Sequence, residues 1–355
     1  APSSNNLHRY VIFRNEIVPE LPISYFEAHT AQALWKSLDD ECLQKDNGCD
    51  VLVIPHNSNL SAGRMFEAVD RNGLPYTRGV AARRAAFEPL VELIQHKGAS
   101  ECRPGFGVED ELCGFEFVPW ATLGGEALGG IPGPQNFTRN ALKKGLQLDQ
   151  AVGANPFKYG FVGSTDTHQG TPGLVNEKNH PGHGGGGALG GTAVGLTELP
   201  EYGPGGLAVL WAEENSRDAL FAAMLRKEAY ATSGTRPIVR FFGGNIASDA
   251  CESATMVEDA YQDGVPMGGA LRKFKNRQLP TFVVSALMDP GTAVHPGTPL
   301  QHIQIIKGWV DAQGQSHEEV FDVAGDPNNG ATVDLTTCEP FGEGIRMRGY
   351  GSLVR

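Results

Sequence analysis

The sequence predicts an α/β fold over residues 1–242 and an antiparallel β domain over residues 243–355. From Leu7 to about Phe242, short apolar runs alternate with segments of helical periodicity, which is typical of a sheet or barrel covered by helices. After Phe242, apolar runs are separated by turn signals and no long helical segment intervenes, which is typical of antiparallel strands. These two observations carry the fold prediction.

The first region contains apolar runs of strand length and segments of helical spacing. We expect strands at Tyr10–Phe13, Val51–Ile54, Val91–Ile94, Tyr159–Val162 and Ala208–Trp211. Thr30 and Ser216 are residue types that cap helix N-termini. The expected helices are Thr30 to about Leu43, Ala81–Phe87, Phe137–Val152 and Arg217–Tyr230.

The second region is rich in β-forming residues. We expect strands at Thr281–Leu287, Ile303–Trp309, Glu319–Val323 and Ala331–Leu335, joined by Gly- and Asn-containing turns. The Gly-rich stretch His180–Gly195 lies within the first region. It is too long and too rich in glycine for a core element, so we expect a loop near the working face or a linker.

Composition excludes several classes of protein. The 355 residues include 40% hydrophobic and 20% charged residues, and no apolar run is long enough for a membrane span. The formal net charge is −12, and no long Lys/Arg block occurs, so a nucleic-acid partner is not expected. The chain begins Ala-Pro-Ser-Ser without a signal peptide, which predicts a processed or cut chain.

The six cysteines include two closely spaced pairs. Cys42 with Cys49 and Cys102 with Cys113 are predicted to form disulfides, and Cys251 with Cys338 is the candidate third pair. Disulfides imply an oxidising compartment, so we expect a periplasmic or secreted protein. The alternative is a cytosolic enzyme with reduced, buried thiols. None of the spacings is that of a zinc ribbon.

Histidines stand close to the ends of predicted strands. His56 follows Val51–Ile54, His96 follows Val91–Ile94, and His8 precedes Tyr10–Phe13. Asp166 and His168 follow Tyr159–Val162 in an Asp-x-His pattern that offers a carboxylate and an imidazole to the same side of an extended segment. Because strand ends converge at the mouth of a βα barrel, we expect these side chains to form a metal site. The alternative is a set of ordinary capping and surface residues.

Other polar residues near these positions are weaker candidates. Glu101 is a candidate catalytic base or substrate contact, and Lys97 a candidate group for a phosphate or another anion. Residues of these types are more often plain surface charges, which is the alternative for both. His180 and His183 are candidate lid residues over the site. The glycines around His183 do not form a phosphate-binding loop, since no strand precedes them and no Gly-Lys-Ser/Thr follows.

A set of dispersed segments resembles a known family. They are Leu7–Arg9, Val11–Asn15, Ile54–Asn59, Gln95–Gly98, Ser100–Cys102, Gly163–His168, Trp211–Asn215, Tyr230–Gly234 and Val239–Gly244. Together they resemble a bacterial family of unknown function, DUF3604, which is related to the polymerase-and-histidinol-phosphatase (PHP) metallohydrolases. The resemblance extends over most of the chain.

The resemblance implies a partial or distorted (β/α)7 barrel of PHP type with divalent zinc, manganese or iron ions in its mouth. It implies hydrolysis of a phosphoester or a related small-molecule ester, and it carries over His56, Asp166 and His168 as ligands. His8 and His96 are candidates from position alone. The family's opening His-x-His and upstream glutamate are missing. We therefore expect a partner chain or a missing N-terminal segment to complete the barrel, or a reduced metal site.

Two function hypotheses follow from these residues. The first is a metal-dependent hydrolase in which ions activate water and polarise the ester. The second is a binding or assembly protein on the same scaffold that has lost its chemistry, including a carbohydrate- or partner-binding protein built on the β domain. Bound metal is the observation that separates the two.

Overall fold

The computed structural model contains two units. It describes residues 5–70, 72–108, 110–125, 130–167, 173, 202–272, 274, 279–294, 296–326, 328, 330, 332–333, 340–341 and 349–354. The first unit draws its residues from Ala1–Val175, His180–Ser233 and Gly308–Glu318, and the second from Asn176–Asn179, Gly234–Lys307 and Glu319–Arg355.

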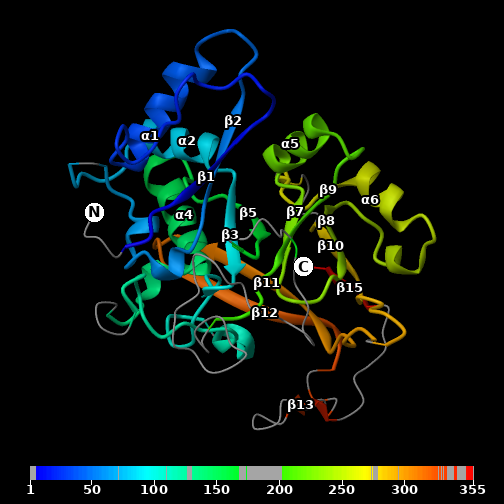
Figure 1. The fold of residues 1–355 in the computed structure, drawn as a ribbon. Coiled ribbons are helices and arrows are strands. Elements are labelled where there is room, and N and C mark those ends of the chain that lie inside the picture. Colours follow the sequence, from blue (N-terminus) through cyan, green and yellow to red (C-terminus); the bar gives the residue numbers. More distant parts are fainter. Residues whose placement is uncertain are drawn as a thin grey trace. The chain divides into compact units, whose positions relative to one another are not determined.

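The strands of the first unit form three small sheets. They are β1 (Arg9–Phe13), β2 (Val51–Pro55), β3 (Leu90–Gln95), β4 (Gly98–Ala99), β5 (Gly160–Gly163), β6 (Leu207–Leu210) and β7 (Ala229–Thr232). β1 pairs antiparallel with β2, β3 pairs parallel with β5, and β6 pairs antiparallel with β7. β2 lies beside β3, and β5 lies beside both β6 and β7 (Figure 1). Within the residues described, these sheets do not close into the expected barrel.

The helices lie where the sequence predicts them, except that the last helix of this unit ends earlier than predicted. The helices are α1 (Ala31–Leu38), α2 (Arg78–Phe87), α4 (Thr138–Val152) and α5 (Arg217–Arg226), and a π-helical turn (Asp39–Leu43) extends α1. Thr30 caps α1 through its hydroxyl, which accepts from the amide of Ala33. The prediction of a helix to Tyr230 is wrong, because Lys227 adopts a left-handed conformation (φ 63°) that ends α5, and β7 begins two residues later.

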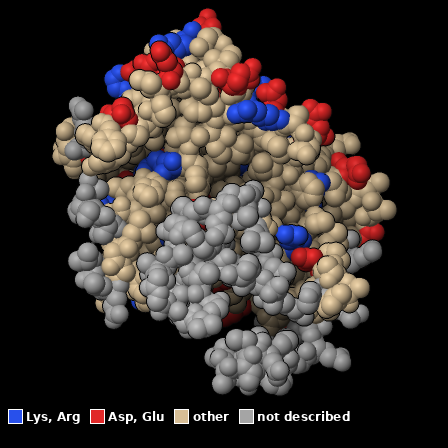
Figure 2. All heavy atoms as spheres, viewed as in Figure 1, with Lys and Arg blue, Asp and Glu red and all other residues tan. Residues whose placement is uncertain are grey.

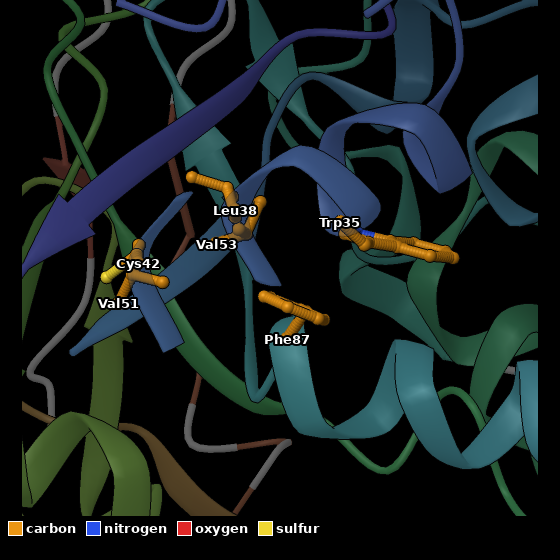
Figure 3. Packing of buried hydrophobic residues seen from close by; sticks show 6 residues of the cluster. All are labelled: Trp35, Leu38, Cys42, Val51, Val53 and Phe87. Atoms are coloured by element: carbon orange, nitrogen blue, oxygen red, sulfur yellow. The ribbon is translucent and has the colours of Figure 1, made fainter. Parts of the chain in front are cut away.

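Strand β2 is buried on both faces. Val51 and Val53 pack against Trp35, Leu38 and Phe87 of the neighbouring helices, in the cluster shown in Figure 3. The alternate residues of β2 belong to a second cluster with residues of β3, β5 and α5. Since successive side chains of a strand point to opposite faces, this double burial marks a strand covered by helices on one side and by protein interior on the other.

The second unit contains a four-stranded antiparallel sheet in the order β15-β10-β8-β9. Its strands are β8 (Ile238–Gly244), β9 (Gly264–Pro266), β10 (Thr281–Leu287) and β15 (Gly349–Val354). Helix α6 (Met256–Asp263), which the sequence did not predict, packs Met256 and Ala260 against Phe242 and Val283 of this sheet. The predicted domain boundary at Phe242 lies inside β8.

The remaining strands form hairpins. β11 (His302–Val310) pairs with β12 (Ser316–Gly325), and β13 (Thr332–Val333) pairs with β14 (Pro340–Phe341). The tip of the first hairpin, Gly308–Glu318, belongs to the first unit, where Gln147 of α4 donates a hydrogen bond to the carbonyl of Gly314 (2.9 Å). No helix in the described part of the chain is long and apolar enough to cross a membrane.

Charged side chains are mixed in sign on the surface of the first unit. In Figure 2, acidic and basic residues alternate over the elements coloured blue in Figure 1. Lys36 with Asp40 and Arg83 with Asp39 are two such pairs. A nucleic-acid-binding face instead gathers positive charge, and the part of the first unit seen in Figure 2 shows no such gathering among its described residues.

Candidate functional site

The predicted histidines meet through the pairing of β1 with β2. Arg9 lies opposite Pro55 in this register, so His8 and His56 lie across from each other at the same end of the hairpin. The amide of His56 donates to the carbonyl of His8 (3.4 Å), and the two ring centroids are 5.6 Å apart. The antiparallel register therefore brings together two residues that are 48 positions apart in the sequence.

Gln95 joins this histidine pair to the end of β5. Its buried amide donates to Asn57 Oδ1, next to His56, and to Asp166 Oδ2 (2.7 Å). Asn57 also accepts from Asn6 (3.3 Å) and lies in the left-handed region (φ 53°), which asparagine tolerates better than most residues. Sequence analysis did not single out Gln95 as a site residue, although it ends the strand that precedes His96.

Lys97 lies between His96 and Asp166. Its ammonium contacts His96 Nε2 and donates to Asp166 Oδ2, and His96 Nε2 lies 3.3 Å from the same oxygen. Burial alone would raise the pKa of Asp166, but hydrogen bonds from His96 and Lys97 hold it well below its usual range. Asp166 is therefore ionised, and the ammonium of Lys97 balances its charge. We call His8, His56, His96, Lys97 and Asp166 the polar cluster.

A buried layer supports the polar cluster. The ring of Tyr10 stacks on His56, with centroids 4.2 Å apart and planes inclined by 10°. The Tyr10 hydroxyl donates to Glu92 Oε2 (3.3 Å), and the Ser164 hydroxyl donates to the same oxygen. Burial raises the pKa of Glu92 to about 8, so this carboxyl group is mostly protonated at neutral pH.

Burial also sets the charge state of His56. It lowers the pKa of this imidazole to about 4, which keeps the ring neutral at neutral pH. Desolvation lowers the pKa of His8 in the same direction. Neutral imidazoles retain a nitrogen lone pair that can bind a metal ion or accept a proton.

A glycine-rich segment packs closely against the backbone of the polar cluster. The Gly206 amide donates to the carbonyl of Ser164 (2.8 Å), and the Gly203 amide donates to the carbonyl of His96 (3.0 Å). Gly205 has φ +78°, and a Cβ there would lie 2.6 Å from the Ser164 carbonyl oxygen. Only glycine fits this approach, a requirement that the Gly-Pro-Gly-Gly sequence signals.

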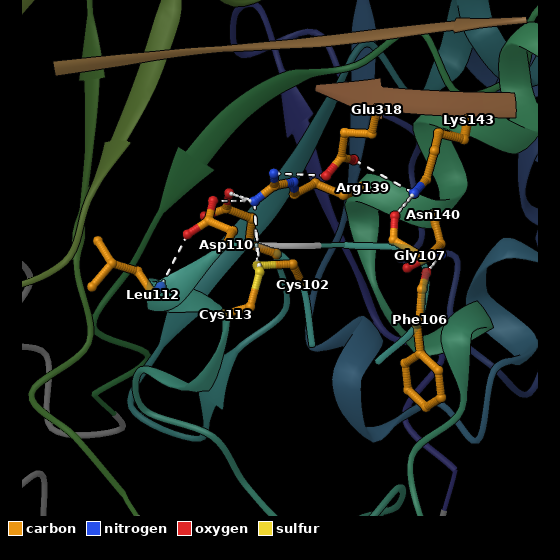
Figure 4. The surroundings of a disulfide bond; sticks show 11 residues. Cys102, Phe106, Gly107, Asp110, Leu112, Cys113, Arg139, Asn140, Lys143 and Glu318 are labelled. Atoms are coloured by element: carbon orange, nitrogen blue, oxygen red, sulfur yellow. Dashed lines mark hydrogen bonds and ion pairs between the residues drawn. A yellow bond between two sulfur atoms is a disulfide. The ribbon is translucent and has the colours of Figure 1, made fainter. Parts of the chain in front are cut away.

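The structure does not bring Glu101 into the polar cluster. Its carboxylate lies 3.5 Å from Arg139, whose ion-pair network with Asp110 and Glu318 is drawn in Figure 4. In that network Arg139 donates to Asp110 (2.7 Å) and Glu318 (2.8 Å), beside a disulfide. His168 and the two lid candidates, His180 and His183, lie outside the described residues.

Both predicted short-range disulfides are confirmed. Cys42 is bonded to Cys49, and Cys102 is bonded to Cys113. Cys251 is half-buried and free, and Cys338 lies outside the described residues.

Metal-ligand types are present in the polar cluster. Imidazole nitrogens and a carboxylate suit zinc, manganese or iron. Among the residues that the structure describes, no three His, Cys, Asp or Glu side chains are grouped closely enough to hold an ion. The ammonium of Lys97 already contacts the carboxylate of Asp166.

Comparison with known proteins identifies a family. No curated protein and no solved structure matches the chain significantly. A family model described as a protein of unknown function, DUF3604, matches residues 1–348. The chain therefore belongs to the DUF3604 family.

Proposed function

We propose that this protein is a metal-dependent hydrolase that acts on a phosphoester or a related ester. The observation that carries the proposal is the polar cluster, in which groups from three strand ends and the start of a fourth strand meet. His56 follows β2, His96 and Lys97 follow β3, and Asp166 follows β5. Such convergence of imidazoles, an ammonium and a carboxylate is typical of a catalytic site rather than of a structural core.

The donor set fits a divalent ion in chemical type. His56 is neutral and Asp166 is ionised, which are the states that metal ligands require. We propose His56, Asp166 and His168 as the ligands, because among the described residues His8, His56 and Asp166 are not grouped closely enough to hold an ion by themselves. When bound, the ion supplies a Lewis acid that polarises the ester and promotes attack by water.

The chain's own residues supply positioning and charge. Lys97 offers an ammonium to the anionic oxygens of a phosphoester, and Gln95 fixes the orientation of Asp166. Tyr10 holds the ring of His56 by stacking, and the Tyr10 hydroxyl is itself anchored on Glu92. This second layer limits the rotamers of the first, as catalytic geometry requires.

The proposal includes the architecture and the compartment. β1, β2, β3, β5 and the β6–β7 pair lie next to one another in that order, which is consistent with part of a PHP-type barrel. The two disulfides favour an oxidising environment, so we propose a periplasmic or secreted location.

One observation favours a second candidate function. Lys97 already neutralises Asp166 and contacts His96, so the polar cluster is charge-paired without a metal ion. The same arrangement would suit a binding protein that uses Lys97 to hold an anion and performs no hydrolysis.

Metal analysis and one substitution separate the two functions. Purified protein should contain about one equivalent or more of zinc, manganese or iron and should hydrolyse an aryl phosphoester. Asp166→Asn should lower that activity at least about tenfold, equivalent to about 1.4 kcal/mol of transition-state stabilisation. Asp149→Asn, at an exposed position on α4, is the matched control and should have no effect. Metal-free protein whose weak hydrolysis is unchanged by Asp166→Asn would instead support the binding protein.

A further inference from the structure

A cavity of about 600 Å³ lies in the first unit on the helix side of β1. Its lining comes from β1 and the segment before it, from α1 and the loop before it, and from the segment 64–84. His8, a member of the polar cluster, and Arg9 both line it, so the cavity lies next to the polar cluster. A volume of this size accommodates a small organic molecule.

Arg9 presents free hydrogen-bond donors to this cavity. Its side chain is only 7% exposed, Nε donates to Glu88 (2.6 Å), and Nη1 donates to the carbonyl of Leu7 (2.7 Å). A guanidinium group has five N–H donors, so three remain, and no described residue accepts from them. These donors are open to a ligand in the cavity, and an anion that accepts from them would form charge-assisted hydrogen bonds, which are stronger than neutral ones.

The charge around Arg9 favours an anion. Glu88 is shared between Arg9 and Arg84, so one buried carboxylate faces two guanidinium groups. All five donors of Arg84 are occupied, by Glu88, two tyrosine hydroxyls and two backbone carbonyls. The two guanidinium groups and one carboxylate together therefore carry one unbalanced positive charge, and the free donors of this group lie on Arg9.

The acidic residues that line the cavity do not compete for Arg9. The carboxylate of Asp70 accepts the amides of Asn72 and Leu74 in its own turn. Glu67 is half-exposed and lies 3.8 Å from Arg64. Neither carboxylate of the cavity wall is bonded to the free donors of Arg9. An anion in the cavity can therefore accept from these donors.

The walls of the cavity suit an apolar or aromatic body. Val11, Ile23 and Leu34 contribute aliphatic side chains, and Tyr25 and Tyr76 contribute rings. Tyr76 is buried, and Tyr25 is 57% exposed at the surface. A planar apolar group can pack against such walls while its anionic end reaches Arg9.

We propose that this cavity binds an organic anion, with a carboxylate, phosphonate, phosphate or sulfonate group on Arg9 and an aromatic or apolar body against the walls. Because His8 lines the cavity and also lies against His56, the bound molecule would be the part of a substrate remote from the scissile ester. This second step rests on the proposed hydrolase function, whereas the binding of the anion does not.

Calorimetric titration with phenylphosphonate, which a hydrolase cannot consume, tests the binding site. Benzoate and benzenesulfonate distinguish the anionic groups, and benzamide is the neutral control. We expect the anions to bind and benzamide to bind at least about tenfold more weakly, because only an anion pairs with Arg9. Equal binding of benzamide and benzoate would overturn the proposal.

Substitutions locate the bound anion. Arg9→Lys keeps the charge that faces Glu88 but loses the fork of donors, and should weaken phenylphosphonate binding at least about tenfold. Val69→Trp should block binding by filling the cavity, which keeps the test valid should Arg9→Lys fail to fold. Arg14→Lys, in an exposed ion pair just after β1, is the matched control and should leave the affinity unchanged. Unchanged affinity in Val69→Trp would refute the cavity as the site.

Two further variants distinguish this site from the polar cluster. Phenylphosphonate should still bind to Lys97→Met, and Arg9→Lys should weaken its binding at least about tenfold in that background as well. Complete loss of binding in Lys97→Met would place the anion at Lys97 and overturn the proposal. Asp166→Asn should lower hydrolysis at least about tenfold and keep phenylphosphonate binding. An Asp166→Asn variant that keeps full hydrolysis would refute the proposed reaction, and the binding data would still decide the cavity.

Discussion

Glu88 is the central acceptor of a buried network, and its replacement should be strongly destabilising. It accepts from Arg9 (2.6 Å), Arg84 (3.0 Å) and Trp35 (3.2 Å), and it is 1% exposed. Glu88→Gln keeps the size of the side chain and removes its charge, which leaves two buried guanidinium groups without a counterion. Removing one partner of a buried ion pair costs about 3–5 kcal/mol. We expect a loss of that size in the free energy of unfolding.

The pH dependence should have a defined sign. Burial opposes the ionisation of Glu88, but Arg84 and Arg9 more than offset this and hold its pKa below the ordinary value of 4.5. Its stabilising contribution is therefore fully present above about pH 4.5 and is lost as pH falls through the lower folded pKa. The difference between wild type and Glu88→Gln should be largest near neutral pH and should shrink in acid.

Urea unfolding followed by fluorescence and circular dichroism measures both effects. Glu213→Gln is the control, because Glu213 is 70% exposed in its pair with Arg226 and should contribute less than about 1 kcal/mol. A loss below about 1 kcal/mol for Glu88→Gln at neutral pH would refute the reasoning, since it would mean that Arg9 and Arg84 do not need this carboxylate. A difference that grows in acid would contradict the sign argument.

Another residue and a disulfide of the first unit give separate predictions. The pKa of Glu92 is raised from 4.5 to about 8, so the folded state holds a proton that the unfolded state releases, and stability should fall as pH rises between these values. Glu92→Gln should remove this decline in urea unfolding, and an unchanged pH profile would contradict it. Replacing Cys102 and Cys113 by serine should lower the free energy of unfolding by about 3 kcal/mol, because the bond closes a loop and so restricts the unfolded chain. An equal stability of oxidised wild type and the double variant would refute this estimate.

The positions of β1, β2, β3, β5 and β6 were predictable because each is a short, mainly apolar run, whereas β4 and β7 were not predicted. Val51–Ile54 is buried throughout, and no polar residue interrupts it, so its sequence predicts a strand. The position of His56 after it follows directly. Gln95 bonds to both Asp166 and Asn57, the neighbour of His56, and this proximity required only that strand ends meet at one edge, which is a property of parallel α/β arrangements.

The supporting layer was not predictable from local patterns. Glu92 interrupts an apolar strand and reads as a residue turned to solvent, yet it faces the interior and bonds to Tyr10 and Ser164. Gln95 reads as a strand terminus, and its role depends on contacts with distant residues. Glu101 lies four residues beyond Lys97, but its carboxylate faces Arg139, beside the disulfide of the adjacent Cys102.

Charge balance in the polar cluster makes a last prediction about metal binding. Asp166 and Lys97 carry opposite charges and contact each other, and His56 is neutral, so a divalent ion would add two unbalanced positive charges to a largely buried site. Excess charge of one sign in a desolvated site is costly, and a phosphoester or inorganic phosphate would offset it. We therefore expect zinc or manganese to bind at least about tenfold more tightly when phosphate is present, measured by calorimetric titration at fixed pH. Lys97→Met removes one positive charge and should tighten metal binding without phosphate, which would reduce the coupling. If the metal affinity changes neither when phosphate is added nor in Lys97→Met, the ion does not bind at Asp166.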